Sequence, residues 1–179
     1  MSAYSLRRVA ILRDGLLAGQ AVALSAGVSA PVRDLLLSLG ATVHEPHQAV
    51  AADVRALVHD AGTSFGPGGE KALLDALEQA WNDVAAVANE ALIGAGQGGK
   101  IVLIAPRAGA GDHADAARDG LENLARTLSV EWARFGITTT AIVPAAAARE
   151  QDVALLVAFL LSPAGDYFSG CRLEIGAAG

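Results

Sequence analysis

The chain holds several residue types that could do chemistry, and their spacing decides which chemistry is available. A tyrosine one helical turn before a lysine can act as a general acid or base, because the lysine cation stabilises the phenolate. The sequence has two lysines, Lys71 and Lys100, and the residues four positions before them are Pro67 and Gly96. Acid/base chemistry by such a pair is therefore excluded, and we expect no catalytic residues of this kind.

Histidines, serines and cysteine offer no recognisable site either. The four histidines show neither the spacing of metal ligands on a helix nor an acidic ligand at a diagnostic distance, so we interpret them as solvated or loop residues and expect no metal. They are His44, His47, His59 and His113. No serine stands in the Gly-x-Ser-x-Gly context of a hydrolase nucleophile. The lone Cys171 permits neither an internal disulfide nor a cysteine metal site.

One turn has the composition of an anion site. The segment 25–31, Ser-Ala-Gly-Val-Ser-Ala-Pro, follows a short apolar run and precedes a helical pattern, and backbone amides at such a helix start can bind phosphate. Ser25, Gly27 and Ser29 are the candidate contacts. The alternative is an ordinary helix start with Ser29 as N-cap and Pro31 in the first turn, and we favour it.

Composition and charge restrict the function classes. Hydrophobic residues make up 53% of the 179 residues and aromatic residues only 4%, and the net charge is −6. No run of lysine or arginine occurs, so a nucleic-acid or anionic-membrane partner is not expected. No apolar stretch approaches the length of a membrane span. These features predict one cytoplasmic α/β domain over residues 1–179.

Strand and helix patterns alternate along the chain. Short apolar runs predict strands over 20–24, 41–44, 54–59, 100–105, 137–143 and 171–175, and apolar residues at helical spacing predict helices over 32–39, 70–93, 117–135 and 149–161. Such alternation predicts a Rossmann-like three-layer α/β sandwich with a mostly parallel sheet of about six strands.

The order and the amino-acid sequences of these segments resemble those of one protein family along nearly the whole chain. The run Gly120-Leu-Glu-Asn-Leu-Ala-Arg-Thr-Leu-Ser-Val-Glu-Trp-Ala-Arg-Phe-Gly-Ile137 resembles the catalytic helix and following strand of the short-chain dehydrogenase/reductase family. Val58-His-Asp-Ala-Gly62 resembles that family's Asn-Asn-Ala-Gly turn, which implies Gly62 as a further cofactor contact. Phe159-Leu-Leu-Ser-Pro163 and Tyr167-Phe-Ser-Gly170 resemble the end of its closing helix and the approach to its last strand.

The differences from that family lie at its catalytic residues and its substrate-binding segments. Aligning Leu121 with the family's leucine puts Ala114 at the tyrosine position and Arg118 at the lysine position, while Pro106 takes the place of the catalytic serine. Residues 45–53 are too few for the helix-strand-helix that the family inserts there, so we expect one edge strand to be missing. The helix that follows Pro144 starts so soon that the substrate lid is also expected to be missing.

The resemblance therefore implies a degenerate, non-catalytic member. It is similar to the non-catalytic amino-terminal domain of large bacterial 3-ketoacyl reductases, and no cofactor is expected. The helices that carry Trp81 and Trp132 have wide apolar stripes, and their equivalents in the family form a four-helix interface, so we expect a homo-oligomer or a partner of the same family. The alternative is an NAD(P)-dependent oxidoreductase with a non-standard site, for which His113 is the candidate acid.

Overall fold

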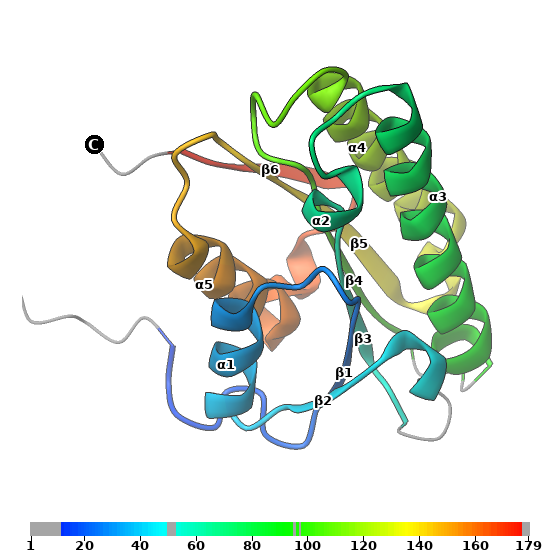
Figure 1. The fold of residues 1–179 in the computed structure, drawn as a ribbon. Coiled ribbons are helices and arrows are strands. Elements are labelled where there is room, and N and C mark those ends of the chain that lie inside the picture. The colour runs from blue at the N-terminus through cyan, green and yellow to red at the C-terminus, as the bar shows by residue number, and fades with distance from the viewer. Residues whose placement is uncertain (1–11, 50–52, 95, 97, 177–179) are drawn as a thin grey trace, which may run out of the picture.

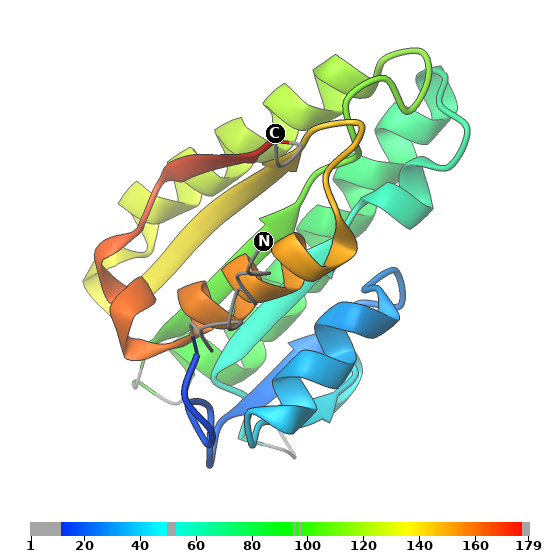
Figure 2. The same ribbon diagram turned by 90° about the vertical axis from the view of Figure 1, so that its left-hand side faces the viewer.

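Six parallel strands form one sheet that is covered by helices on both faces (Figures 1 and 2). The computed structural model describes residues 12–49, 53–94, 96 and 98–176. The strand order is β2-β1-β3-β4-β5-β6, and every neighbouring pair is parallel. The strands are β1 (Ala21–Leu24), β2 (Thr42–His44), β3 (Ala56–Asp60), β4 (Gly99–Ile104), β5 (Ile137–Pro144) and β6 (Cys171–Ile175). The predicted parallel α/β sandwich of about six strands is confirmed.

Helices α1 and α5 cover one face of the sheet, and α2, α3 and α4 cover the other (Figure 1). The bounds are α1 Ala30–Ser38, α2 Gly62–Phe65, α3 Glu70–Val87, α4 Ala114–Glu131 and α5 Glu150–Leu161. A π-helical segment, Ala88–Ile93, continues α3, so the helix predicted over 70–93 is present with a wider final turn. Short 3-10 turns lie at Pro46–Gln48, Ala133–Phe135 and Pro163–Tyr167.

The core divides into two apolar layers, one on each side of the sheet. Because successive side chains of a strand point to opposite faces, Leu57 of β3 packs toward α3 and α4 while Val58 packs toward α1 and α5. On α4 the buried residues follow helical spacing: Ala117, Leu121, Ala125 and Leu128. The period of apolar residues thus determines both the elements and the faces they bury.

The carboxyl ends of the strands carry the loops that could build a site. Strand β3 ends at Asp60, one residue later than the sequence pattern indicated, so Asp60 belongs to the sheet together with His59. Strand β2 lies at one edge of the described sheet and is followed only by the 3-10 turn before residues 50–52, which lie outside the described part. Residues 145–149 alone connect β5 to α5. None of the helices in the described ranges could cross a membrane.

Candidate functional site

A cleft lies at the carboxyl ends of the central strands. The strand order reverses between β1 and β3, and in open parallel sheets ligands bind at such a switch point. The cleft encloses about 260 Å³. Its polar and glycine lining comes from the end of β3, from the segments that follow β1, β3 and β4, and from the start of α5: Gly27, Ser29, Asp60, Gly62, Thr63, Arg107 and Glu150. Three of the four residues predicted to contact a cofactor, Gly27, Ser29 and Gly62, therefore share one cleft.

The fourth residue, Ser25, lies behind the cleft and ties two strands together. Its side chain is buried, and its Oγ accepts a hydrogen bond of 3.0 Å from the backbone N–H of Asp60. At Gly27 a Cβ atom would lie 2.5 Å from the Asp60 carbonyl oxygen, so a larger residue would push the turn away from β3. Packing against β3 is thus a sufficient reason for a serine and a glycine at these positions.

Ser29 takes the N-cap position of α1 without acting as a hydrogen-bonding cap. Its φ and ψ are −65° and 152°, as at an N-cap, but its side chain makes no cap bond. The Ser29 Oγ is buried and has no hydrogen-bond partner within the described residues. An N-cap oxygen accepts from the N–H of the second or third helical residue, and Pro31, the second, has none. The interpretation of Ser29 as an ordinary cap is corrected in this respect.

We expect Ser29→Ala to change the free energy of unfolding by less than about 0.5 kcal/mol, because no hydrogen bond is lost. A serine that caps a helix would cost about 1 kcal/mol on the same change. The comparison variant is Ser25→Ala, which leaves the buried Asp60 N–H without its partner and should cost about 1–3 kcal/mol. Urea unfolding of the three proteins measures both values, and equal losses in the two variants would contradict this account.

Asp60 is the most perturbed acid of the cleft. Its Oδ1 accepts a hydrogen bond of 2.8 Å from the Gly62 N–H. Burial raises the pKa of Asp60 from 3.8 to about 6, and the nearby Glu150 carboxylate acts in the same direction. The Gly62 hydrogen bond and the charges of His59 and Arg107 oppose this shift. Among the described residues of the cleft, Asp60 is therefore the one that can exchange a proton near neutral pH. The sequence pattern did not indicate this role, because it placed Asp60 in a loop after the predicted strand.

Arg107 binds the segment that leads into α5 through hydrogen bonds and an ion pair. Its Nη2 pairs with the Glu150 carboxylate, and its Nη1 donates to the carbonyl oxygens of Ala148 at 2.5 Å and Ala145 at 3.3 Å. The guanidinium thus holds residues 145–150 at the rim of the cleft. No local sequence pattern predicts this contact, because Arg107 and Glu150 are separated by 43 positions.

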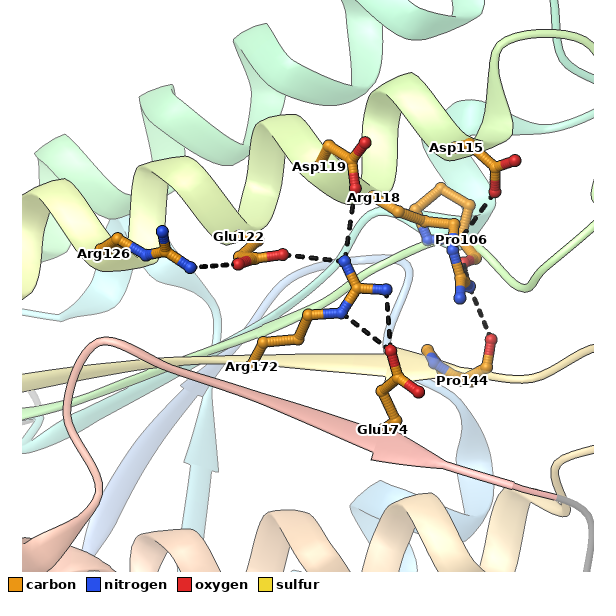
Figure 3. A network of polar contacts seen from close by, with 9 residues as sticks. All are labelled: Pro106, Asp115, Arg118, Asp119, Glu122, Arg126, Pro144, Arg172 and Glu174. Carbon is orange, nitrogen blue, oxygen red and sulfur yellow. Dashed lines mark hydrogen bonds and ion pairs between the residues drawn. The ribbon is translucent and has the colours of Figure 1, made fainter.

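Arg118 is a buried structural tie between two strands (Figure 3). Its Nη1 donates to the carbonyl oxygens of Pro106 at 2.9 Å and Pro144 at 2.6 Å, and its Nε lies 3.7 Å from the Asp115 carboxylate. Pro106 follows β4 and Pro144 ends β5, so the guanidinium joins the carboxyl ends of both strands to α4. Its donors at Nη1 are directed at protein carbonyl groups.

The described lysines and histidines and Tyr167 lie away from the cleft. No tyrosine, lysine or histidine is among the described residues that line it. Lys100 binds the carbonyl oxygens of Leu160 and Ser162 at the far end of α5, and Tyr167 is 91% exposed beside that end. Tyr4 lies outside the described residues. His113 is exposed, with φ of 67°, immediately before α4.

His59 corrects the expectation that the histidines are solvated or lie in loops. It is only 2% exposed on β3, and its Nδ1 lies 2.8 Å from the Asp83 carboxylate on α3. Its Nε2 is buried and has no partner within the described part of the chain. This pair connects the sheet to α3. No group of three potential metal ligands occurs among the described residues.

The two tryptophans occupy different environments. Trp132, just after α4, is 9% exposed and belongs to the core between the sheet and α3 and α4. Trp81 on α3 is 48% exposed, and Leu74, two turns earlier on the same helix, is 59% exposed. The exposed large apolar side chains of this helix pair are therefore Leu74 and Trp81 on α3 and Val130, which is 76% exposed, near the end of α4.

Comparisons with known proteins show similarity in fold. The chain matches no protein-family model and no curated protein sequence. Among solved structures, a citronellol catabolism dehydrogenase from Pseudomonas aeruginosa aligns with a TM-score of 0.71 and 24% identity, over 94% of this chain and 98% of that one. A hydroxysteroid dehydrogenase from Escherichia coli aligns with a TM-score of 0.69 and 15% identity, over 93% and 99%.

A third match is a double mutant of a short-chain dehydrogenase/reductase from Serratia marcescens, with a TM-score of 0.67 and 21% identity, over 90% of this chain and 97% of that one. These alignments extend over nearly the full length of each chain at low identity. They show that the chain has the Rossmann-like fold of short-chain dehydrogenases.

Proposed function

We propose that this chain is a non-catalytic module with a dehydrogenase-like fold, which associates through α3 and α4 with a second copy or with a partner of the same fold. The observation that carries the proposal is Arg118. It stands where the resembled family has its lysine, yet it is buried and donates to two strand-end carbonyl groups. An arginine guanidinium stays protonated in proteins, so this side chain is a poor proton donor.

The neighbouring positions support the same conclusion. Ala114 stands at the position of the family's tyrosine, and its side chain is a buried methyl group. Pro106 stands at the position of the family's serine and has no hydroxyl group. General acid catalysis needs a titratable group within hydrogen-bond reach of the reacting atom. In the described cleft the candidates are Asp60 and Glu150, and Glu150 is already paired with Arg107.

The outer side of α3 supports association. Leu74 and Trp81 lie two turns apart on one side of this helix, so both project from it in the same direction. Helix α4 packs closely beside α3, since a Cβ atom at Gly120 would lie 2.8 Å from the Leu77 side chain. Exposed tryptophan beside leucine is typical of the centre of a protein interface.

The test is the mass of the protein in solution. We expect the wild type to form a dimer, and the double variant Leu74→Glu with Trp81→Glu to dissociate at least about a hundredfold more readily, because two apolar anchors of about 2 kcal/mol or more become charged. Leu37→Glu is the matched control, since Leu37 is 49% exposed on α1, on the opposite face. A wild type that stays monomeric at high concentration contradicts self-association.

The alternative is an NAD(P)-dependent oxidoreductase, and the observation that favours it is the cleft at the switch point of a fold that is similar to three dehydrogenase or reductase structures. His113 would have to reach the cleft from its exposed position before α4. Titration with NADH and NADPH, followed by a ketone-reduction assay of His113→Ala, tests this function. Tight binding together with activity lost in that variant would replace the proposal above.

A further inference from the structure

We propose that Glu150 is a built-in occupant of an anion site: paired with Arg107, its carboxylate prevents small phosphate anions from binding in the cleft. This contact is an autoinhibitory device within the chain, and it is independent of the association through α3. Its basis is the arrangement of two helix starts, one cation and two carboxylates around the same space.

Two helices begin at the cleft with positive partial charge. Ser29, which precedes α1, and Glu150, the first residue of α5, line the cleft, and neither Ser29 nor Arg149, the residue before α5, makes a side-chain cap bond. The free N–H groups of a helix start attract an anion. At α1 the Ser29 hydroxyl is buried and unpartnered in the described structure, which leaves a further polar group at the same wall.

Glu150 supplies the anion from within the chain. It is the first residue of α5, so its carboxylate lies at the positive end of that helix. Its partner, Arg107, is the only cationic side chain among the described residues that line the cleft. A guanidinium binds a carboxylate and a phosphate with the same fork of donors, so a phosphate would have to displace Glu150 from Arg107.

Asp60 adds to the effect of Glu150 in keeping phosphate anions out of the cleft. It faces the same cleft, and its charge and that of Glu150 are close enough to disfavour each other. A phosphate group entering beside them would meet two carboxylates against one guanidinium, in a partly desolvated space where like charges repel more strongly than in water. Removing either carboxylate should therefore open the site.

The contact can be removed without unfolding the protein. The Arg107 and Glu150 side chains are 32% and 41% exposed, and ion pairs at this exposure contribute little to stability. Arg107 also retains its bonds to the carbonyl oxygens of Ala145 and Ala148. The arginine should thus stay at the rim of the cleft, with Nη2 available to a ligand.

Calorimetric titration with inorganic pyrophosphate, at low ionic strength and about pH 8, tests the proposal. We expect Glu150→Ala to bind at least about tenfold more tightly than the wild type, with Glu150→Gln in between because its amide oxygen still accepts from Arg107 but carries no charge. Glu131→Ala, which removes an exposed carboxylate of α4, should bind as the wild type does.

A second variant tests whether Arg107 is the residue that binds the phosphate. Adding Arg107→Met to Glu150→Ala should return the affinity to the wild-type level or below it. Asp60→Asn should raise the affinity while Glu150 is intact, which provides a test that does not depend on the fold of the Glu150 variants. Equal affinity of wild type and Glu150→Ala, or binding that survives the loss of Arg107, would overturn the proposal. Neither result depends on the oligomeric state.

Discussion

Asp60→Asn is expected to stabilise the protein by about 2–3 kcal/mol at about pH 8 and to have almost no effect at about pH 4. The cause is the burial that raises the pKa of Asp60 from 3.8 to about 6. Each pKa unit corresponds to about 1.4 kcal/mol of difference between the two protonation states. The folded state therefore prefers the protonated acid by up to about 3 kcal/mol.

The sign follows from linkage. A group whose pKa is higher in the folded than in the unfolded state contributes stability that is complete below about pH 4 and is lost as the pH rises through about 6. Asparagine resembles the protonated acid at every pH, and its Oδ1 can still accept from the Gly62 N–H. The variant should thus avoid the loss that the wild type suffers above about pH 6.

Urea unfolding across that pH range measures the effect. The control is Asp34→Asn, an exposed carboxylate on α1, whose effect should stay within about 0.5 kcal/mol throughout. A stability difference between Asp60→Asn and wild type that stays constant from about pH 4 to about pH 8 would show that the Asp60 carboxyl is not perturbed by burial.

Arg118→Met is expected to destabilise the protein by about 2–4 kcal/mol. The change leaves the Pro106 carbonyl without its partner and weakens the hydrogen bonding of the Pro144 carbonyl, and each unsatisfied buried group costs about 1–3 kcal/mol. Methionine retains much of the apolar stem, so the loss reports mainly on the guanidinium. The tie between β4, β5 and α4 would be broken at the carboxyl ends of both strands (Figure 3).

Two further variants distinguish the loss of the Arg118 hydrogen bonds from the loss of a positive charge. Arg118→Lys retains the charge and up to three donors, so it should lose about half as much as the methionine variant. Arg33→Met removes an exposed arginine of α1 and should stay within about 0.5 kcal/mol. A loss below about 1 kcal/mol for Arg118→Met, measured by urea unfolding, would mean that the strand ends do not depend on the guanidinium.

Most of the fold could be predicted from the local sequence, because local patterns encode it. The apolar runs of strand length and the helical period of Ala117, Leu121 and Leu128 are properties of neighbouring residues, and the structure places a strand or a helix at each. Boundaries were less certain by a residue or two. At β3 that residue mattered, because it moved Asp60 from a predicted loop into the sheet.

Burial was less predictable than secondary structure. Trp81 and Trp132 both stand in apolar stripes, yet one is half exposed on α3 and the other is buried against the core. The helical period gives the direction of a side chain from its own axis, but the neighbour that covers it depends on how the helices pack. Ser29 differs, because Pro31 at the second helical position shows in the sequence that one of the two usual donors of a cap bond is missing.

The absence of the tyrosine–lysine pair can be read from the amino-acid sequence without any structure. Two lysines, neither preceded by a tyrosine one turn earlier, exclude that acid/base pair whatever the fold, because spacing along a helix is fixed by the chain. The residues that line the cleft, by contrast, are known only from the three-dimensional structure. Asp60, Arg107 and Glu150 come from three distant segments, and they meet because parallel strands bring their carboxyl ends to one edge of the sheet. Their charges and burial depend on that meeting.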